Sequence, residues 1–159
     1  MSDTTLTRTS DREIVITRTF RAPPRLVFTA FTDAEHVAKW WAPKSRGTSM
    51  SSCEADVRVG GAYRYVLSTP HGEVAFSGRY IELTRPSRVV YSQVFEPMAD
   101  GGEALVTVTF DEHAGEQTRM TSIERYPSKE ALEAALESGM EGGMRETLDQ
   151  LDALVASMR

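Results

Sequence analysis

Phenol, guanidinium and carboxylate groups lie at positions from which they could move protons. Tyr63 and Tyr65 are two residues apart, whereas Arg58, Tyr80 and Glu124 are scattered along the chain. Such groups act as general acids and bases when a fold places them around one substrate. Their dispersal makes a catalytic centre the minority interpretation, so the sequence assigns no catalytic residue.

Metal and nucleophile chemistry find little support in the sequence. The three histidines are far apart, and the single cysteine, Cys53, has no second cysteine beside it, so no metal-ligand spacing occurs. Nucleophile elbows, phosphate-binding loops and dinucleotide fingerprints are also missing. Gly60-Gly61 is instead typical of a turn between two strands. We therefore expect no metal and no cofactor.

Charge pairs admit two interpretations. Asp56 and Arg58 are two residues apart on one expected strand, and Glu124 and Arg125 are adjacent near the end of another. Surface pairing is the default for such groups and contributes little to stability. The alternative is that they point inward and orient a polar group of a ligand.

The composition indicates one ordinary globular domain. The chain has 159 residues with 40% hydrophobic and 26% charged residues, which fits a single core. A net charge of −5 argues against a nucleic-acid surface. One cysteine fits a reducing compartment, and neither a signal peptide nor an apolar run long enough to span a membrane is present. We expect a cytoplasmic protein with a flexible arm over residues 1–11 and one domain over residues 12–159.

The elements that must position these groups follow from periodicity. A β-branched run over residues 12–20 predicts a strand, and two short helices follow over residues 25–31 and 34–41, the second capped near Asp33. Residues 44–52 are expected to be a loop. Six further strands are then expected over residues 53–59, 62–68, 73–83, 88–95, 104–110 and 117–126, with a bulge at Gly78. Short turns between them require an antiparallel sheet.

A long amphipathic helix is expected to complete the chain from Ser128 to Met158. Its apolar stripe recurs in steps of three and four, at Leu132, Leu136, Met140, Met144, Leu148, Leu151, Val155 and Met158. Three glycines interrupt its first half, at Gly139, Gly142 and Gly143. Each costs about 1 kcal/mol relative to alanine. They indicate either a bend or room left for a ligand. The predicted fold class is therefore α+β, with about seven antiparallel strands wrapped around one helix.

Four segments resemble a known family. They read RTFRAPPRLVFTAFTDAEHVAKWWAP, DVRVGGAYRYVL, FSGRYIELTRPSRVVYSQVF and SGMEGGMRETLDQLDALV. Together they resemble the SRPBCC (START-like) superfamily, and within it the group related to the C-terminal domain of the activator of heat shock protein 90 ATPase. The resemblance covers residues 12–158 and implies the helix-grip fold. One departure is Met144, because many relatives carry Trp there.

The resemblance also implies an apolar cavity between the sheet and the helix. Aromatic residues at inward strand positions suit that cavity, phenol hydroxyls need partners when buried, and methionines adapt to irregular shapes. Adjacent residues on a helix point about 100° apart, so one Trp of the Trp40-Trp41 pair would anchor its helix and the other would line the cavity mouth. The candidate ligand-binding residues are Phe28, Phe31, Trp40, Trp41, Tyr63, Tyr65, Phe76, Tyr80, Tyr91, Met120, Met140 and Met144. The alternative is that these side chains only fill a core.

We therefore expect a protein that binds a small hydrophobic molecule, of a lipid or aromatic type. One alternative is an enzyme similar to the polyketide cyclases and aromatases of the superfamily. A second alternative, from the family label, is a partner protein that activates a chaperone ATPase. Self-association into a homodimer through a sheet edge or the outer sheet face is also open.

Overall fold

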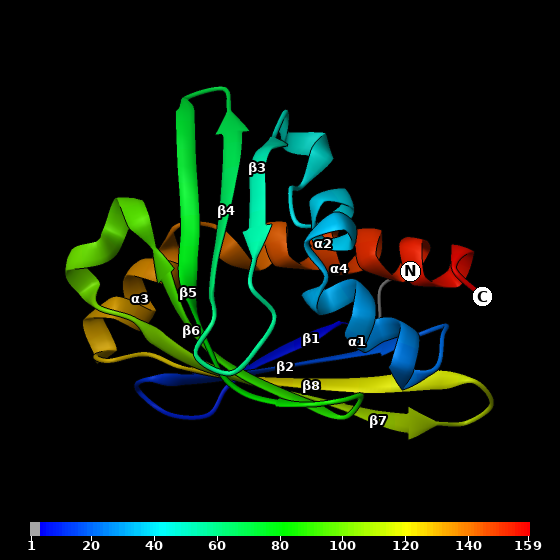
Figure 1. The fold of residues 1–159 in the computed structure, drawn as a ribbon. Helices are drawn as coiled ribbons and strands as arrows, with labels where there is room; N and C mark the ends of the chain where they lie inside the picture. Colours follow the sequence, from blue (N-terminus) through cyan, green and yellow to red (C-terminus); the bar gives the residue numbers. More distant parts are fainter. Residues whose placement is uncertain (1–3) are drawn as a thin grey trace.

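The computed structural model describes residues 4–159 as one curved sheet, two pairs of helices and two short 3₁₀ segments (Figure 1). The strands are β1 (Thr5–Arg8), β2 (Glu13–Phe20), β3 (Ser49–Ala55), β4 (Ala62–Thr69), β5 (Gly72–Thr84), β6 (Arg88–Phe95), β7 (Ala104–His113) and β8 (Gln117–Arg125). The helical elements are α1 (Pro24–Thr32), α2 (Ala34–Trp40), η1 (Lys44–Arg46), η2 (Glu96–Gly101), α3 (Lys129–Glu137) and α4 (Met140–Ser157). Pro24 begins α1, and the Asp33 side chain caps α2 by accepting a hydrogen bond from the Glu35 amide.

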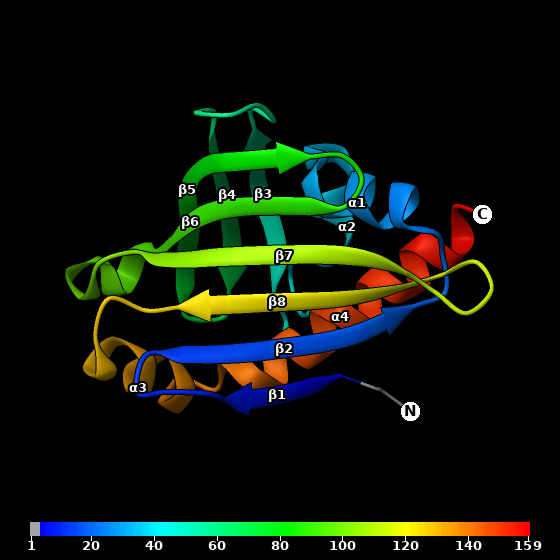
Figure 2. The same cartoon turned by 90° about the horizontal axis from the view of Figure 1, so that it is seen from below.

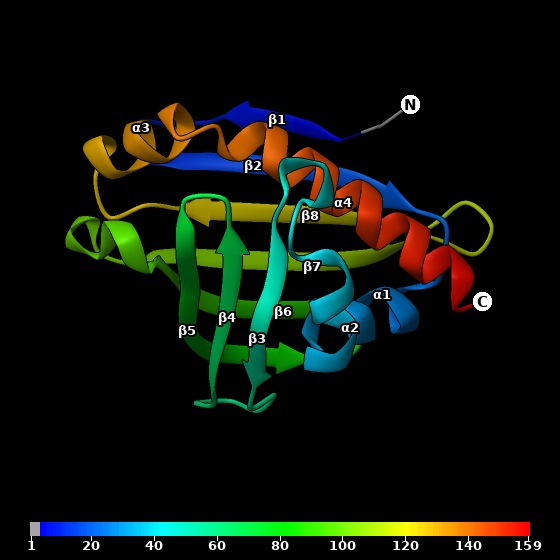
Figure 3. The same ribbon diagram turned by 90° about the horizontal axis from the view of Figure 1, so that it is seen from above.

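All neighbouring strands are antiparallel, in the order β1-β2-β8-β7-β6-β5-β4-β3. Figure 2 shows β1, β2, β8, β7 and β6 side by side, with α4 behind them. Figure 3, from the opposite side, shows α4 running across the sheet with α1 and α2 beside it. The α+β class and the helix-grip arrangement expected from the sequence are therefore confirmed, with eight strands where about seven were expected.

The sheet turns a corner within β5. Figure 1 shows β3, β4 and the first part of β5 standing upright, whereas β2, β7 and β8 lie almost at right angles to them. The register of β5 against β6 shifts between Tyr80 and Glu82. Such bulges bend a strand and increase its twist. The bulge predicted at Gly78 is therefore displaced to Tyr80–Glu82, and Gly78 has the separate role described below.

The N-terminal segment is more ordered than expected. Residues 1–3 of the predicted arm lie outside the described residues. Thr5–Arg8 form strand β1, which pairs with β2 from Thr5 opposite Thr17 to Arg8 opposite Ile14. Strand β1 was missed because its alternation is almost entirely polar and only Leu6 packs toward the core.

Strand β3 also differs from the expectation. The sequence predicted a loop over 44–52 and a strand over 53–59, whereas β3 spans Ser49–Ala55 and Val59 is 65% exposed. β3 is an edge strand and pairs with one neighbouring strand only. Its Ser-rich sequence has few apolar residues, so the alternation of apolar and polar residues that predicts a strand is weak there. The 56–61 segment is a longer connection closed by the Asp56 amide, which donates to the Ala62 carbonyl at 2.9 Å.

The C-terminal helix is broken once. Ser128 caps α3 as predicted, by accepting from the Ala131 amide at 3.0 Å. Helix α3 then ends at Glu137, and Gly139 has φ +84°, a left-handed conformation that glycine adopts without strain. The expected single helix over 128–158 is therefore two helices. The apolar residues recur in steps of three and four on both sides of the break, because this spacing shows which side chains are buried and does not require a continuous helix.

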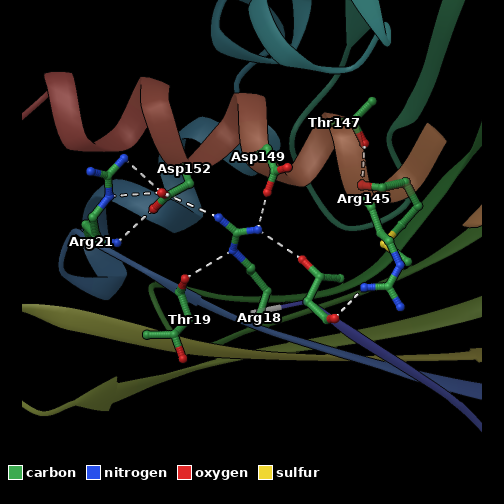
Figure 4. Close-up of polar contacts among 9 residues, drawn as sticks. Arg18, Thr19, Arg21, Arg145, Thr147, Asp149 and Asp152 are labelled. Carbon is green, nitrogen blue, oxygen red and sulfur yellow. Dashed lines mark hydrogen bonds and ion pairs between the residues drawn. The ribbon is translucent and has the colours of Figure 1, made fainter. Parts of the chain in front are cut away.

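The C-terminal half of α4 is fixed to β2 by a buried ionic network (Figure 4). Arg18, which points inward from β2 and is 5% exposed, pairs with Asp149 and lies 3.4 Å from an Asp152 oxygen. Arg21 also binds Asp152, at 2.9 Å. Leu148, Leu151 and Val155 complete the contact on the apolar side. This half of α4 is therefore a fixed structural wall.

Among residues 4–159, no helix is long and apolar enough to span a membrane.

Candidate functional site

Six of the predicted ligand-binding residues surround one small cavity on the concave side of the sheet. The cavity has a volume of about 10 Å³ and is lined by Phe31, Trp41, Tyr63, Tyr65, Val89, Tyr80 and Tyr91. Tyr63 is the centre of the group, because its ring centroid lies 4.9 Å from that of Tyr65, 5.6 Å from Tyr80 and 5.7 Å from Tyr91. A cavity of this volume holds about one water molecule.

Strand register explains why these rings meet. Tyr65 pairs with Phe76 across β4 and β5, and Tyr80 pairs with Tyr91 across β5 and β6. Tyr63 pairs with Gly78, whose missing side chain gives the phenol ring room. A Cβ atom at Gly78 would lie 2.8 Å from the Tyr63 ring and 1.9 Å from the Ser92 carbonyl oxygen. The Tyr63 hydroxyl crosses this space and donates to that carbonyl at 2.8 Å.

The phenols of the cluster are held neutral. Burial raises the pKa of Tyr63, Tyr65 and Tyr91, so none of them ionises near neutral pH. The Tyr80 hydroxyl is buried and makes no hydrogen bond of good geometry, and only the neighbouring Tyr65 hydroxyl interacts with it. A buried hydroxyl without a hydrogen bond costs about 1–3 kcal/mol. The cluster therefore presents, inside an apolar cavity, a polar atom that the protein itself satisfies only weakly.

The two tryptophans divide as the sequence predicted. Trp40 is 2% exposed, and its indole N–H donates to the Ala30 carbonyl at 2.8 Å, which fixes α2 to α1. Trp41 is half-buried, lines the cavity and packs against Tyr65 at 4.9 Å and Phe76 at 5.6 Å. Its position makes Trp41 the candidate wall between the cavity and the surface.

The other predicted residues lie outside the cavity lining. Phe28 and Met120 are buried around Phe110, which contacts Phe28 ring to ring and faces Met120 across β7 and β8. Phe76 is half-buried, and its ring packs against that of Phe95. Phe95 was not among the candidate residues predicted from the sequence, although it lies on the same inward face of β6 as Tyr91. A ligand role for the twelve residues stays a prediction.

Met140 and Met144 lie half-buried at the start of α4, and the Met140 sulfur lies 3.8 Å from the Tyr126 hydroxyl. The space beside Gly142 is not vacant. An added Cβ at Gly142 would lie 2.4 Å from the Arg46 guanidinium, which reaches over from η1. Ser45 and Glu146 hold η1 against α4 through hydrogen bonds of 2.7 Å from the Ser45 amide and hydroxyl.

Glu124 points inward from β8, on the same face as the buried Met120 and Ser122. Burial raises the pKa of its carboxyl, and the Tyr126 hydroxyl donates to it at 3.0 Å. Glu124 lies opposite Val106 of β7, which in turn lies opposite Tyr91 of β6, so the three residues form one row across the sheet. The other charge pair, Asp56 with Arg58, is exposed and joined at 2.7 Å, so the surface interpretation holds there.

Neither metal nor thiol chemistry is indicated. In the part of the chain that the structure describes, no cluster of three histidine, cysteine or acidic side chains could hold a metal ion. Burial raises the pKa of the half-buried Cys53 thiol to about 11, so it is protonated and a poor nucleophile.

A curved antiparallel sheet that closes on a C-terminal helix, with two short helices at one end and an aromatic cavity between, defines the helix-grip fold of the SRPBCC superfamily. The chain belongs, within it, to the family described as "Activator of Hsp90 ATPase homolog 1-like protein", whose model matches residues 21–156.

Solved structures agree with this assignment. A protein from Rhodobacter sphaeroides is 28% identical, with a TM-score of 0.87 over 98% of this chain and 99% of that one. A Mycobacterium smegmatis protein is 27% identical, with a TM-score of 0.82 over 95% and 97%. An HSP90 activator from Plasmodium falciparum is 24% identical, with a TM-score of 0.68 over 91% and 96%, and it shows the shared fold alone. No curated protein matches the sequence.

Proposed function

We propose that this protein binds a small apolar or aromatic molecule between the sheet and the helices that cover it. The observation that carries the proposal is the ring of phenols and Trp41 around a cavity in which the Tyr80 hydroxyl lacks a hydrogen bond of good geometry. A core that served packing alone would gain from phenylalanine at Tyr80, because an unpaired buried hydroxyl is costly. A ligand or a water molecule supplies the partner.

Binding requires that the site open. The cavity of about 10 Å³ is far smaller than the roughly 300 Å³ or more of typical ligand pockets. Trp41 is half-buried and lines the cavity, so it is the side chain whose movement would widen the site. The first turns of α4, with Met140 and Met144, lie outside the lining, and the hydrogen bonds from Ser45 to Glu146, and not the Arg18 network, hold them in place. The break at Gly139 separates α3 from α4 and provides a hinge at the start of these turns.

The neutral fluorescent probe prodan tests the proposal. Its emission shifts and its polarisation rises when it leaves water, and titration with the protein should give a saturable signal with one site. Native mass spectrometry of protein purified from its host, followed by solvent extraction, would identify a natural ligand. A protein that binds no probe and carries no extractable molecule would contradict the proposal.

A matched pair of variants locates the site. Met144→Trp places a large ring in the half-buried interior and should weaken prodan binding by on the order of tenfold, or about 1.4 kcal/mol. Ala153→Trp adds the same ring on the exposed side of α4 and should leave binding unchanged. Equal effects of the two substitutions would place the probe elsewhere.

An activity on a chaperone ATPase is the function that the family description suggests. Stimulation of Hsp90 ATP hydrolysis by the purified chain would support that role, and it is independent of prodan binding. The cyclase-like alternative has one observation in its favour, the inward Glu124 carboxyl, and loss of turnover in Glu124→Gln with a candidate polyketide substrate would support it.

A further inference from the structure

The inner face of β6 and β8 carries hydrogen-bond acceptors that the protein does not fully use. Glu124 accepts one hydrogen bond, from Tyr126 at 3.0 Å. The side-chain oxygen of Gln93, on the adjoining row of β6, is buried without any partner. The third polar group is the Tyr80 hydroxyl on β5, which lines the cavity and interacts only with the Tyr65 hydroxyl, without a hydrogen bond of good geometry. The Glu124 carboxylate and the Gln93 side-chain oxygen can only accept hydrogen bonds, so the partners that they lack are hydrogen-bond donors.

No basic side chain compensates Glu124 among the described residues. Arg125, its neighbour on β8, points to the opposite face and pairs with Glu13 at 3.6 Å. Arg145 on α4 is engaged by Glu141 at 2.8 Å and by the Thr4 carbonyl. Glu124 is half-buried by its accessible surface, and the withdrawal of its carboxyl from water raises its pKa. A carboxylate withdrawn from water without a cation beside it is costly.

Aromatic rings share the inner face of the sheet with this uncompensated carboxylate, and the nearest cluster member, Tyr91, is separated from it by Val106 on the strand between them. Tyr91 is in the same cross-strand row, and Tyr63 packs on Tyr91 with ring centroids 5.7 Å apart. Ring faces attract cations when water is excluded. An anion and several ring faces without an internal cation form an environment that is complementary to a positively charged group on an apolar body.

We propose that Glu124 anchors the protonated amine of an aromatic or apolar amine, with Gln93 as a second acceptor and the tyrosine cluster around the apolar body. The inference rests on the interior ligand site proposed above and names the chemical class of its ligand. Glu124 makes the specific contact, because its charge acts on both Tyr63 and Tyr91 from the inner face of β8, whereas Glu103, which also acts on Tyr63, is exposed.

Three indoles that differ only in their head groups test the amine preference. Tryptamine carries an ammonium, tryptophol a hydroxyl and indole-3-acetate a carboxylate. Isothermal titration at neutral pH should show tryptamine binding at least about tenfold more tightly than tryptophol, since a hydrogen bond to a charged group contributes about 1.5–3 kcal/mol. Indole-3-acetate should bind most weakly, because two carboxylates repel.

The Glu124→Gln variant should lower the affinity for tryptamine to that for tryptophol and leave tryptophol unaffected. Glu130→Gln, an exposed position on α3, is the matched control and should change neither affinity. Circular dichroism and thermal unfolding establish that each variant is folded. Should Glu124→Gln fail to fold, Gln93→Leu carries the same test and should reduce the tryptamine preference in part.

The outcomes separate the two proposals. Equal affinities for tryptamine and tryptophol, or an amine preference that survives Glu124→Gln, would overturn the amine assignment while leaving ligand binding intact. The same holds for a protein that binds prodan but none of the three indoles. A protein that binds neither prodan nor any indole would overturn the interior site itself.

Discussion

At the scale of single residues, the Tyr63 phenol organises the interior by crossing Gly78 to reach the Ser92 carbonyl. Its ring contacts three other tyrosines, so the position of one hydroxyl sets the shape of the cavity. The ring can take this path because Gly78 has no side chain. Gly78 and Tyr63 therefore act as one unit.

Replacement of Gly78 by alanine should destabilise the protein. The new Cβ would lie 1.9 Å from a backbone oxygen that cannot move alone, and overpacking of this kind costs about 2 kcal/mol. Urea unfolding measures the effect. Glu73→Ala, exposed on the same strand, is the control and should stay within about 0.5 kcal/mol of the parent. Equal stabilities would show that β5 and β6 separate freely here.

Glu124 makes stability depend on pH. Its pKa is raised above the ordinary value of 4.5 in the folded state by burial, so the folded protein binds the proton more tightly than the unfolded chain. The contribution of Glu124 to stability is therefore most favourable below pH 4.5 and is lost as the pH rises through the folded pKa. Glu124→Gln should raise the midpoint of thermal unfolding at pH 7 and lose this advantage near pH 4. A constant difference across that range would contradict the assignment.

At the scale of elements, the two halves of α4 are held to the rest of the protein in different ways. Figure 4 shows Arg18 of β2 reaching the Asp149 and Asp152 side chains of α4. The earlier turns of α4 are held by hydrogen bonds instead, such as those from the Ser45 amide and hydroxyl to Glu146. The proposed opening of the interior would involve these earlier turns.

Removal of the buried partner of Arg18 should be costly. Asp152→Ala leaves a guanidinium that is 6% exposed facing one partially exposed carboxylate, and breaking a buried pair costs about 3 kcal/mol or more. Asp149, whose side chain is 51% exposed, is the matched control, and Asp149→Ala should cost about 1 kcal/mol or less. Chemical denaturation of both variants gives the comparison. Equal losses would show that the network is a surface one.

Two glycines of the helix pair should respond with opposite signs. Gly139 has φ +84° with open space around it, so Gly139→Ala should destabilise the fold by about 1 kcal/mol through backbone strain alone. Gly142 is inside α4 and faces only the mobile end of Arg46, so Gly142→Ala should stabilise by about 0.5 kcal/mol. Thermal unfolding measures both effects. A gain in stability for Gly139→Ala would mean that α3 and α4 are continuous.

At the scale of the whole molecule, the outer face of the sheet is partly apolar. Ile81, Leu105 and Ile123 are exposed by 51%, 42% and 36%, and β1 and β3 present free edges. Homodimer formation through this surface stays a prediction. Sedimentation velocity should show a dimer that grows with concentration and is lost in Leu105→Glu, while Glu73→Ala behaves as the parent. A sedimentation coefficient that is independent of concentration would count against a dimer.

The sequence by itself determined the order of the elements from β2 onward apart from the break in the C-terminal helix, together with the caps and the inward faces of most strands. Asp33 and Ser128 were predictable as caps because capping depends on neighbouring amides. Tyr63, Tyr65 and Tyr80 were predictable as inward residues because side chains alternate along a strand. These properties are local, so a single sequence carries them.

Only the tertiary structure decided where the helix breaks, how small the cavity is and which polar groups remain unpaired. The helix glycines were interpreted from the sequence as either a bend or room for a ligand, and the structure shows that Arg46 from a distant segment covers Gly142. The fit of Tyr63 over Gly78, and the lack of a cation beside Glu124, depend on strands that are separated in sequence. Pairing and packing between distant segments set these features, and no periodicity within one segment records them.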